Sequence, residues 1–192
     1  MVKRLYLILT LVFAPVTLLY AAPPTGNVYA VEVIVFENRL PDLEGGELWR
    51  NQPDKSADTD IAVAINAGAP AAPDSSLSAA ADALEKSGHH HVLAHLLWQQ
   101  TAEAKSVSTP VKISSAEAGL DGALRFYLSR YLLVDLNLTL RGAAGGGLFG
   151  VSEPDTPVYR LSEYRRVKLL ETHYFDHPKF GALVRVAPVK AN

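Results

Sequence analysis

Histidines are the side chains of this chain that most readily bind a metal ion. All six fall into two clusters, which are His89, His90, His91 and His95, and then His173 and His177. Imidazole nitrogens ligate zinc, and Asp176 or Glu171 could add an oxygen ligand. However, neighbouring residues on a strand point to opposite faces, and no HExxH or comparable motif occurs. The sequence therefore predicts solvated or hydrogen-bonded histidines, with no metal site.

Residues that could catalyse hydrolysis are present, but their spacing matches no catalytic motif. No serine stands in a GxSxG elbow, and no SxxK motif occurs. Hydrolysis by paired carboxylates needs two acids about 5 to 9 Å apart, and the sequence does not bring two acids together. The acids available are Glu32, Glu163, Glu171 and Asp176. The absence of cysteine excludes disulfides and thiolate nucleophiles. We therefore expect a protein that is not an enzyme and needs no cofactor.

Arginine and aromatic residues gather in three segments of the last third of the chain, Arg130-Tyr131, Glu163–Arg166 and His173–Pro178. Guanidinium groups suit carboxylates, and aromatic faces suit the CH surfaces of sugar rings. A sugar-containing ligand that carries carboxylates would use both. The residues that we expect to contact such a ligand are Trp98, Arg165, Arg166, His173 and Tyr174.

The same segments allow a purely structural interpretation, because some of their charges share a strand face with apolar residues. Glu32 lies on the otherwise apolar second face of its strand, and Arg130 occupies a charged position on an apolar face. Inward charges are costly unless they are paired. This interpretation predicts a buried ion-pair network of Glu32, Arg130, Glu163 and Asp176, which Arg165 would also join.

Period-2 alternation of apolar residues predicts the strands that position these side chains. Tyr29–Glu37 is apolar on both faces, as in a central strand, and His91–Gln99 follows as a second strand. Every second residue from 124 to 140 is apolar apart from Arg130. Such a run would exceed about 50 Å, so a bend or turn near Ser129-Arg130 should divide it. Two further strands are predicted at Tyr159–Glu171 and Ala182–Val189, joined by a turn-rich connection over residues 173–181.

One helix is predicted from about Leu77 to Lys86, with Ser76 or Ser78 as its N-cap and Gly88 as its stop. Together with the strands it indicates an α+β fold with a mainly antiparallel sheet. One or two helices would follow the first strand, together with a long Ala/Pro/Gly-rich insertion at residues 41–76.

The amino terminus has the pattern of a secretory signal. Lys3 and Arg4 precede an almost unbroken apolar run over residues 5–20, which is shorter than a membrane span. We therefore expect a removable signal at residues 1–22 and a single exported α+β domain at 23–192 without a stable membrane anchor. An uncleaved anchor is the alternative. A formal charge of −2 argues against a nucleic-acid partner.

Four segments together resemble one protein family. In order they are YAVEVIVFE, HVLAHLLWQQ, LDGALRFYLSRYLLVDLNL and YRLSEYRRVKLLETHYFDHPKFGALVRV. Their order and residues resemble the CsiV family of periplasmic peptidoglycan-binding proteins. The chain departs from that pattern at Leu133, where a histidine is expected, and at Val167, where a methionine is expected. The matching positions are Glu32, Phe36, Trp98, Gln99, Gly122, Arg130–Leu132, Arg165, Arg166, His173, Tyr174, Asp176–Pro178 and Gly181.

The resemblance implies a non-enzymatic periplasmic protein that binds peptidoglycan and supports cell-wall biogenesis and cell shape. Its implied partners are a bifunctional penicillin-binding protein and the outer-membrane lipoprotein that activates this synthase. A protein–protein adaptor without glycan contact is the alternative, and a metal-dependent cell-wall hydrolase is a third.

Overall fold

The computed structural model describes residues 27–39, 75–142 and 157–189 of the chain. The expected secretory signal at 1–22 lies outside these ranges, as does all of the expected insertion at 41–76 except Ser75 and Ser76. Within the described ranges, no helix has the length and apolar composition needed to cross a membrane.

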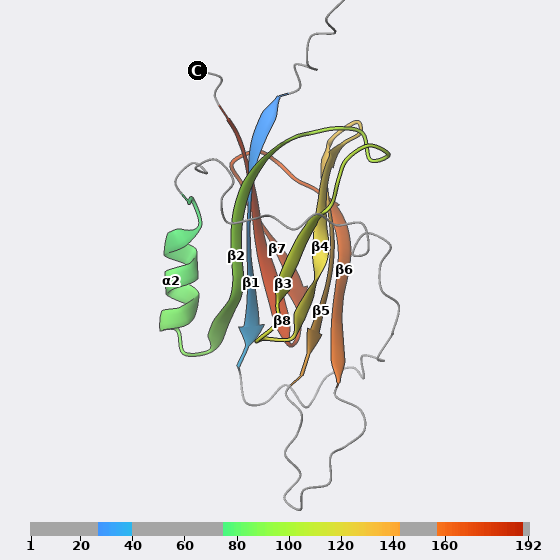
Figure 1. Cartoon of the computed structure of the whole chain (residues 1–192). Coiled ribbons are helices and arrows are strands. Elements are labelled where there is room, and N and C mark those ends of the chain that lie inside the picture. Colours follow the sequence, from blue (N-terminus) through green and yellow to red (C-terminus); the bar gives the residue numbers. More distant parts are fainter. Residues whose placement is uncertain (1–26, 40–74, 143–156, 190–192) are drawn as a thin grey trace, which may run out of the picture.

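Within these ranges, eight strands form two four-stranded sheets that face each other (Figure 1). The first sheet has the order β2-β1-β8-β7 and the second has the order β3-β4-β5-β6, and all neighbouring strands are antiparallel. The first sheet contains β1 (Val28–Asn38), β2 (His90–Thr101), β7 (Thr172–His177) and β8 (Phe180–Pro188). The second contains β3 (Val111–Ser115), β4 (Leu120–Leu128), β5 (Leu132–Arg141) and β6 (Val158–Arg166).

The hydrophobic core lies between the two sheets. Each strand contributes alternate residues to it, because successive side chains on a strand point to opposite faces. From β1 the odd-numbered valines enter this core, and from β4 and β5 the even-numbered residues do so, as the alternation predicts. The fully buried members include Val31, Val33, Val35, Leu124, Phe126, Val134, Leu136 and Leu138.

A single described helix, α2 (Ser78–Lys86), covers the outer face of the first sheet (Figure 1). It packs Leu77 against Ile34 and Phe36, so β1 is buried on both faces and the prediction of a central strand is confirmed. Gly88 follows the helix with φ +70, as expected of a stop. The N-cap prediction is wrong, because the N-cap residue is Leu77 and no side chain of the helix start caps it.

The α+β class and the antiparallel pairing are confirmed, but the strands form two sheets rather than one. The long alternating run is divided, as predicted, by a turn at residues 129–131 between β4 and β5. The strand expected at Tyr159–Glu171 ends at Arg166, and the expected connection at 173–181 begins as strand β7. Strand β3 was not predicted, since five residues show too little alternation to identify it.

The strands run up and down, so their connections collect at two ends of the sandwich. The β4–β5 end carries the β4–β5 turn, the β6–β7 turn and the β2–β3 linker (Figure 1). The β3–β4 end carries the β3–β4 turn, the β7–β8 turn, the end of β1 and the start of β2. Ligand-binding groups can therefore collect at either end.

Candidate functional site

Exposed tyrosines and arginines lie together on the outer face of the second sheet, near the β4–β5 end. Tyr164 and Arg166 are two residues apart on β6 and so project from the same face. Arg166 is in register with Leu133 of β5, and Tyr131 lies two residues before Leu133. We call Arg130, Tyr131, Tyr164 and Arg166 the tyrosine–arginine surface.

Cation–π contacts hold the two arginines of this surface against one ring. The guanidinium carbon of Arg166 lies 3.8 Å from the ring centroid of Tyr131, and that of Arg130 lies 5.6 Å from it. Tyr164 is 72% exposed and Tyr131 is 40% exposed. The two guanidinium groups can donate hydrogen bonds to a carboxylate while the accessible rings stack on a sugar ring.

Arg165 points to the opposite side of β6 and connects the edges of the two sheets. It forms an ion pair with Glu163, and its Nη1 donates a hydrogen bond of 2.8 Å to the backbone oxygen of Tyr174 on β7. Its guanidinium also lies 4.7 Å from the ring centroid of Phe175. The hydrogen bonds of Arg165 therefore join β6 to β7.

Tyr174 lies on the outer face of the first sheet and is 43% exposed. Its ring stacks on Phe36 with centroids 6.1 Å apart, and its hydroxyl donates a hydrogen bond of 2.6 Å to Asp176. Burial, together with the hydrogen bond to the negative Asp176, raises the pKa of the Tyr174 hydroxyl well above its ordinary value. At neutral pH this hydroxyl stays protonated, and it already donates its hydrogen bond to Asp176.

The remaining two expected ligand contacts serve local structure. Trp98 is 5% exposed in the core between the sheets, and its indole Nε1 donates a 2.6 Å hydrogen bond to Gln100. His173 accepts a hydrogen bond of 3.0 Å at Nε2 from the backbone of Lys168, which closes the β6–β7 turn. The five residues expected to contact ligand therefore do not share one face, and Trp98 is inaccessible because the second sheet covers it.

The four members of the expected ion-pair network do not meet, because they lie on different sheets. Arg130 is exposed in the β4–β5 turn, and Asp176 is exposed on β7. Only Glu163 has the expected kind of partner, which is Arg165, and both side chains are about one third exposed. The alternation of β4 and β5 is interrupted at the turn, so Arg130 leaves the inward face that sequence parity had assigned to it.

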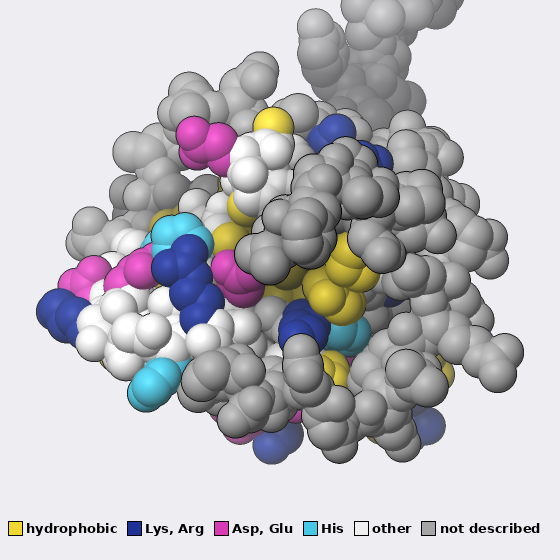
Figure 2. Space-filling view, turned by 90° about the horizontal axis from the view of Figure 1, so that it is seen from below, with side chains coloured by type: hydrophobic (Ala, Val, Ile, Leu, Met, Phe, Trp, Pro, Cys, Tyr) yellow, Lys and Arg dark blue, Asp and Glu magenta, His cyan; other side chains and the backbone are white. Residues whose placement is uncertain are grey.

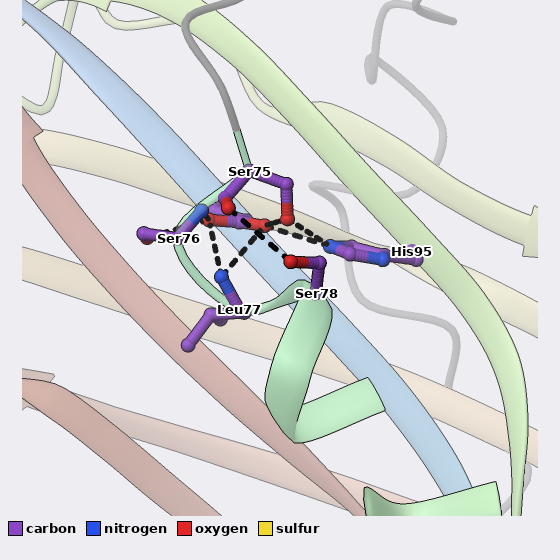
Figure 3. Close-up of polar contacts among 6 residues, drawn as sticks. Ser75, Ser76, Leu77, Ser78 and His95 are labelled. Atoms are coloured by element: carbon purple, nitrogen blue, oxygen red, sulfur yellow. Dashed lines mark hydrogen bonds and ion pairs between the residues drawn. The ribbon is translucent and has the colours of Figure 1, made fainter. Parts of the chain in front are cut away.

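Glu32 is the buried member of that set, at 2% exposure. Its partners Ser75, Ser76 and Leu77, which Figure 3 labels, lie at the start of α2. Its carboxylate accepts hydrogen bonds from the hydroxyls of Ser75 and Ser76 and from the backbone N–H groups of Ser76 and Leu77. His95 Nε2 lies 2.7 Å from the same carboxylate. Glu32 thus caps α2 from a strand 43 residues or more away in sequence.

Burial alone would raise the pKa of Glu32, but the hydrogen bonds from Ser75, His95 and Ser76 outweigh it and lower the pKa. The trio of serine, histidine and acid does not have the geometry of a nucleophile relay. Such a relay uses both imidazole nitrogens, one for the serine and one for the acid. Here Ser75 and Glu32 face the same nitrogen of His95, and the Ser75 hydroxyl donates directly to Glu32.

The other histidines are distributed along the first sheet. His91 lies 3.1 Å from Glu85, and His90 lies 3.0 Å from the hydroxyl of Ser87. His177 is buried, and its Nδ1 accepts a hydrogen bond from the backbone of Lys179. In the described part of the chain, no group of three or more histidine, aspartate or glutamate side chains converges as metal ligands would.

A pocket of about 440 Å³ opens at the β3–β4 end of the sandwich. Figure 2 views this end, and acidic, basic and histidine side chains lie side by side there. The wall combines the end of β1, the start of β2 and the β3–β4 turn. Its lining residues are Glu37, Arg39, His91, Val92, Leu93, Ser115, Glu117, Ala118 and Leu140.

Sequence reasoning missed two parts of these sites. Tyr164 lies in the segment that was singled out, and its even-numbered parity with Arg166 would have placed both on one face. No residue pattern in the sequence indicated the pocket. Arg39 and Glu117 are 78 residues apart, and only the packing of the two sheets brings the end of β1 to the β3–β4 turn.

Comparison with known proteins gives one match. Neither the curated proteins nor the solved structures contain a match to this chain. The model of one protein family, described as "Peptidoglycan-binding protein, CsiV", matches residues 67–189. This stretch contains α2 and every strand except β1. It covers more than half of the chain, and the chain therefore belongs to the CsiV family of peptidoglycan-binding proteins.

Proposed function

We propose that this protein binds peptidoglycan directly, in the periplasm and without catalysing a reaction on it, through the tyrosine–arginine surface. The observation that carries the proposal is the pair of guanidinium groups held on the ring of Tyr131 beside the exposed ring of Tyr164. Membership of a peptidoglycan-binding family supports the choice of ligand.

The chemistry of the surface suits both parts of a peptidoglycan strand. The face of Tyr164 offers a flat apolar area on which the CH groups of a sugar ring can stack. Arg130 and Arg166 offer planar sets of N–H donors for the carboxylates of stem peptides. Because the ring of Tyr131 restrains both side chains, less conformational entropy is lost when they bind.

A pull-down with purified sacculi tests this proposal. The unmodified protein should sediment with sacculi at low salt, and Tyr164→Ala and Arg166→Gln should each weaken binding about fivefold, since an aromatic or charged contact contributes about 1 kcal/mol. Lys112→Gln, on the exposed side chain of β3, is the matched control and should bind normally. Protein that stays in the supernatant, or sediments equally well with all variants, contradicts the proposal.

A second candidate function is an adaptor between proteins, and exposed apolar side chains favour it. Val107, Leu128, Leu169 and Leu170 are between 37% and 64% exposed, and all lie in connections or strand ends at the β4–β5 end (Figure 1). Exposed apolar side chains concentrated in one region are typical of protein contacts. The partners would be the bifunctional penicillin-binding protein and its lipoprotein activator. The Leu170→Ser variant should copurify less of these proteins and should bind sacculi normally. This result would support the adaptor role.

A further inference from the structure

The pocket at the β3–β4 end combines both signs of charge with an apolar wall. We propose that it binds the zwitterionic end of an amino acid, in which one carbon carries both an ammonium and a carboxylate. If the protein binds peptidoglycan as proposed above, the source of this group is the uncrosslinked diamino acid of a stem peptide.

Arg39 supplies the group that would bind the carboxylate. Its Nε lies 3.4 Å from Glu37, and its side chain is 53% exposed. Among the described residues, no hydrogen bond engages its two terminal nitrogens. Those nitrogens form the end of the guanidinium fork, which is the geometry that binds a carboxylate through two parallel hydrogen bonds.

Glu37 and Glu117 supply the acceptors for the ammonium. The Glu37 side chain is 40% exposed and keeps one oxygen near Arg39. The carboxylate of Glu117 is exposed in the β3–β4 turn, and in the described ranges it makes no hydrogen bond or ion pair. An ammonium has three donors, which is enough for both carboxylates that line the pocket.

The balance of charges selects a zwitterion over a simple ion. An anion without an ammonium would approach Arg39 but would meet two carboxylates that repel it. A cation without a carboxylate would bring no partner for Arg39 and would be repelled by its positive charge. Only a ligand with both groups matches both signs, which is how charged sites discriminate between ligands.

The remaining wall suits the aliphatic chain of the same amino acid. Val92, Leu93, Ala118 and Leu140 provide its apolar surface. The volume of about 440 Å³ lies within the range of about 300 to 1,000 Å³ that is common for small-molecule sites. A chain of methylene groups can therefore lie against this wall while its charged end reaches Arg39.

Crosslinking of the wall would abolish this recognition. A crosslink acylates the ammonium, which removes its charge and two of its three donors. Glu37 and Glu117 would then face an amide in place of an ammonium. The pocket would distinguish uncrosslinked peptides from crosslinked ones, whereas the tyrosine–arginine surface would bind both.

Calorimetric titration of the purified protein with 2,6-diaminopimelic acid tests the inference. We expect saturable binding at one site, and at least about tenfold weaker binding for Arg39→Gln and for Glu117→Gln, because hydrogen bonds to charged groups are lost. Lys105→Gln and Glu103→Gln, both on exposed side chains of the β2–β3 linker at the opposite end, are the matched controls, which should bind normally. N-acetylated diaminopimelic acid, with both ammonium groups acylated, should also bind at least about tenfold more weakly.

The inference is overturned if diaminopimelic acid does not bind, if the acetylated form binds as tightly, or if the pocket variants bind like the controls. Sacculus binding separates this result from the proposed function. Arg39→Gln should still sediment with sacculi, because the tyrosine–arginine surface binds them on its own, but less tightly than the unmodified protein. Sacculus binding without diaminopimelate binding leaves the proposed function standing alone, and the reverse result leaves the pocket as a site for free amino acids. Thermal unfolding of each variant confirms that it is folded.

Discussion

Glu32 shows how far a single residue can be predicted from sequence. Its position on an apolar strand face correctly indicated a buried carboxylate that needs partners. The identity of those partners was predicted wrongly. Arginines were expected, whereas the structure provides hydroxyl and backbone donors at the start of α2 and the imidazole of His95. Backbone N–H groups bear no sequence signature, so nothing in the residue types pointed to them.

Replacement of Glu32 by glutamine should loosen the helix while the shape of the side chain is kept. The amide keeps one acceptor, and its NH₂ group faces donors that now lack a partner. We expect the free energy of unfolding to fall by about 1 to 3 kcal/mol. Urea denaturation measures this change, and Asp82→Asn, on an exposed side chain of the same helix, should change the free energy of unfolding by about 0.5 kcal/mol or less. Equal effects of the two variants would contradict the capping role of Glu32.

Among the elements, those with long alternation were predicted and those defined by contacts were not. The strands β1, β2 and β8 and the β4–β5 pair follow from period 2, and α2 follows from its spacing and from Gly88. The connection between β6 and β7 was misplaced. Its turn contains Leu170 at φ +65, a conformation in which leucine is rare, so the residue types there did not indicate a turn.

The pairing of β4 with β5 depends on Gly122, whose backbone passes close to the neighbouring strand. A Cβ atom at this position would lie 2.8 Å from the Cα of Leu138 and would collide with the carbonyl of Asn137. We expect Gly122→Ala to lower the free energy of unfolding by about 2 to 3 kcal/mol, as overpacking does.

Gly88→Ala is the control for this prediction. It also has a positive φ, but no atom lies within 4 Å of its added Cβ, so the cost should be only about 1 kcal/mol. Chemical denaturation of both variants measures the difference. An equal loss at the two positions would show that backbone conformation, and not the approach of β5, requires glycine at 122.

At the scale of the whole molecule, the class of fold was predictable and the division into two sheets was not. Alternation states that a strand has an inner and an outer face, but it does not state which sheet the strand joins. Both sheets are antiparallel and contribute alternate apolar residues to the same core, so their strands look alike in sequence. The placement of Trp98 shows the result, because the second sheet buries its ring. Its hydrogen-bond partner Gln100 lies on the same strand and donates in turn to the backbone oxygen of Phe126 on the second sheet.

Three described groups that are at least partly buried contribute to the dependence of stability on pH. Burial, with a smaller effect of Lys179, lowers the pKa of His177 from its ordinary 6.5 despite the opposing charge of Asp176. As pH falls below about 6.5, the unfolded chain takes up a proton that folded His177 does not, so stability falls. Glu32 has a lowered pKa, and its contribution is lost as pH falls below about 4.5. Tyr174 has a raised pKa, and its contribution is lost above about 10.

The expected result is a urea midpoint that is highest between about pH 6.5 and 10 and falls on both sides of this range. His177→Gln should flatten the first decline on the acid side and leave the decline below pH 4.5 in place. Urea titrations across pH 3 to 11 measure both effects. A midpoint that stays constant from pH 7.5 to 5.5 in the unmodified protein would contradict the contribution of His177.

The up-and-down course of the strands has a consequence for the way that this protein could hold a polymer. The pocket and the tyrosine–arginine surface lie at opposite ends of β5, which has ten residues and so is on the order of 30 Å long. A rigid sandwich keeps that separation fixed. A repeating polymer can then occupy both places at once. Its second attachment is intramolecular, so two weak contacts together give strong bivalent binding. The strength of this binding depends on the spacing of the repeats.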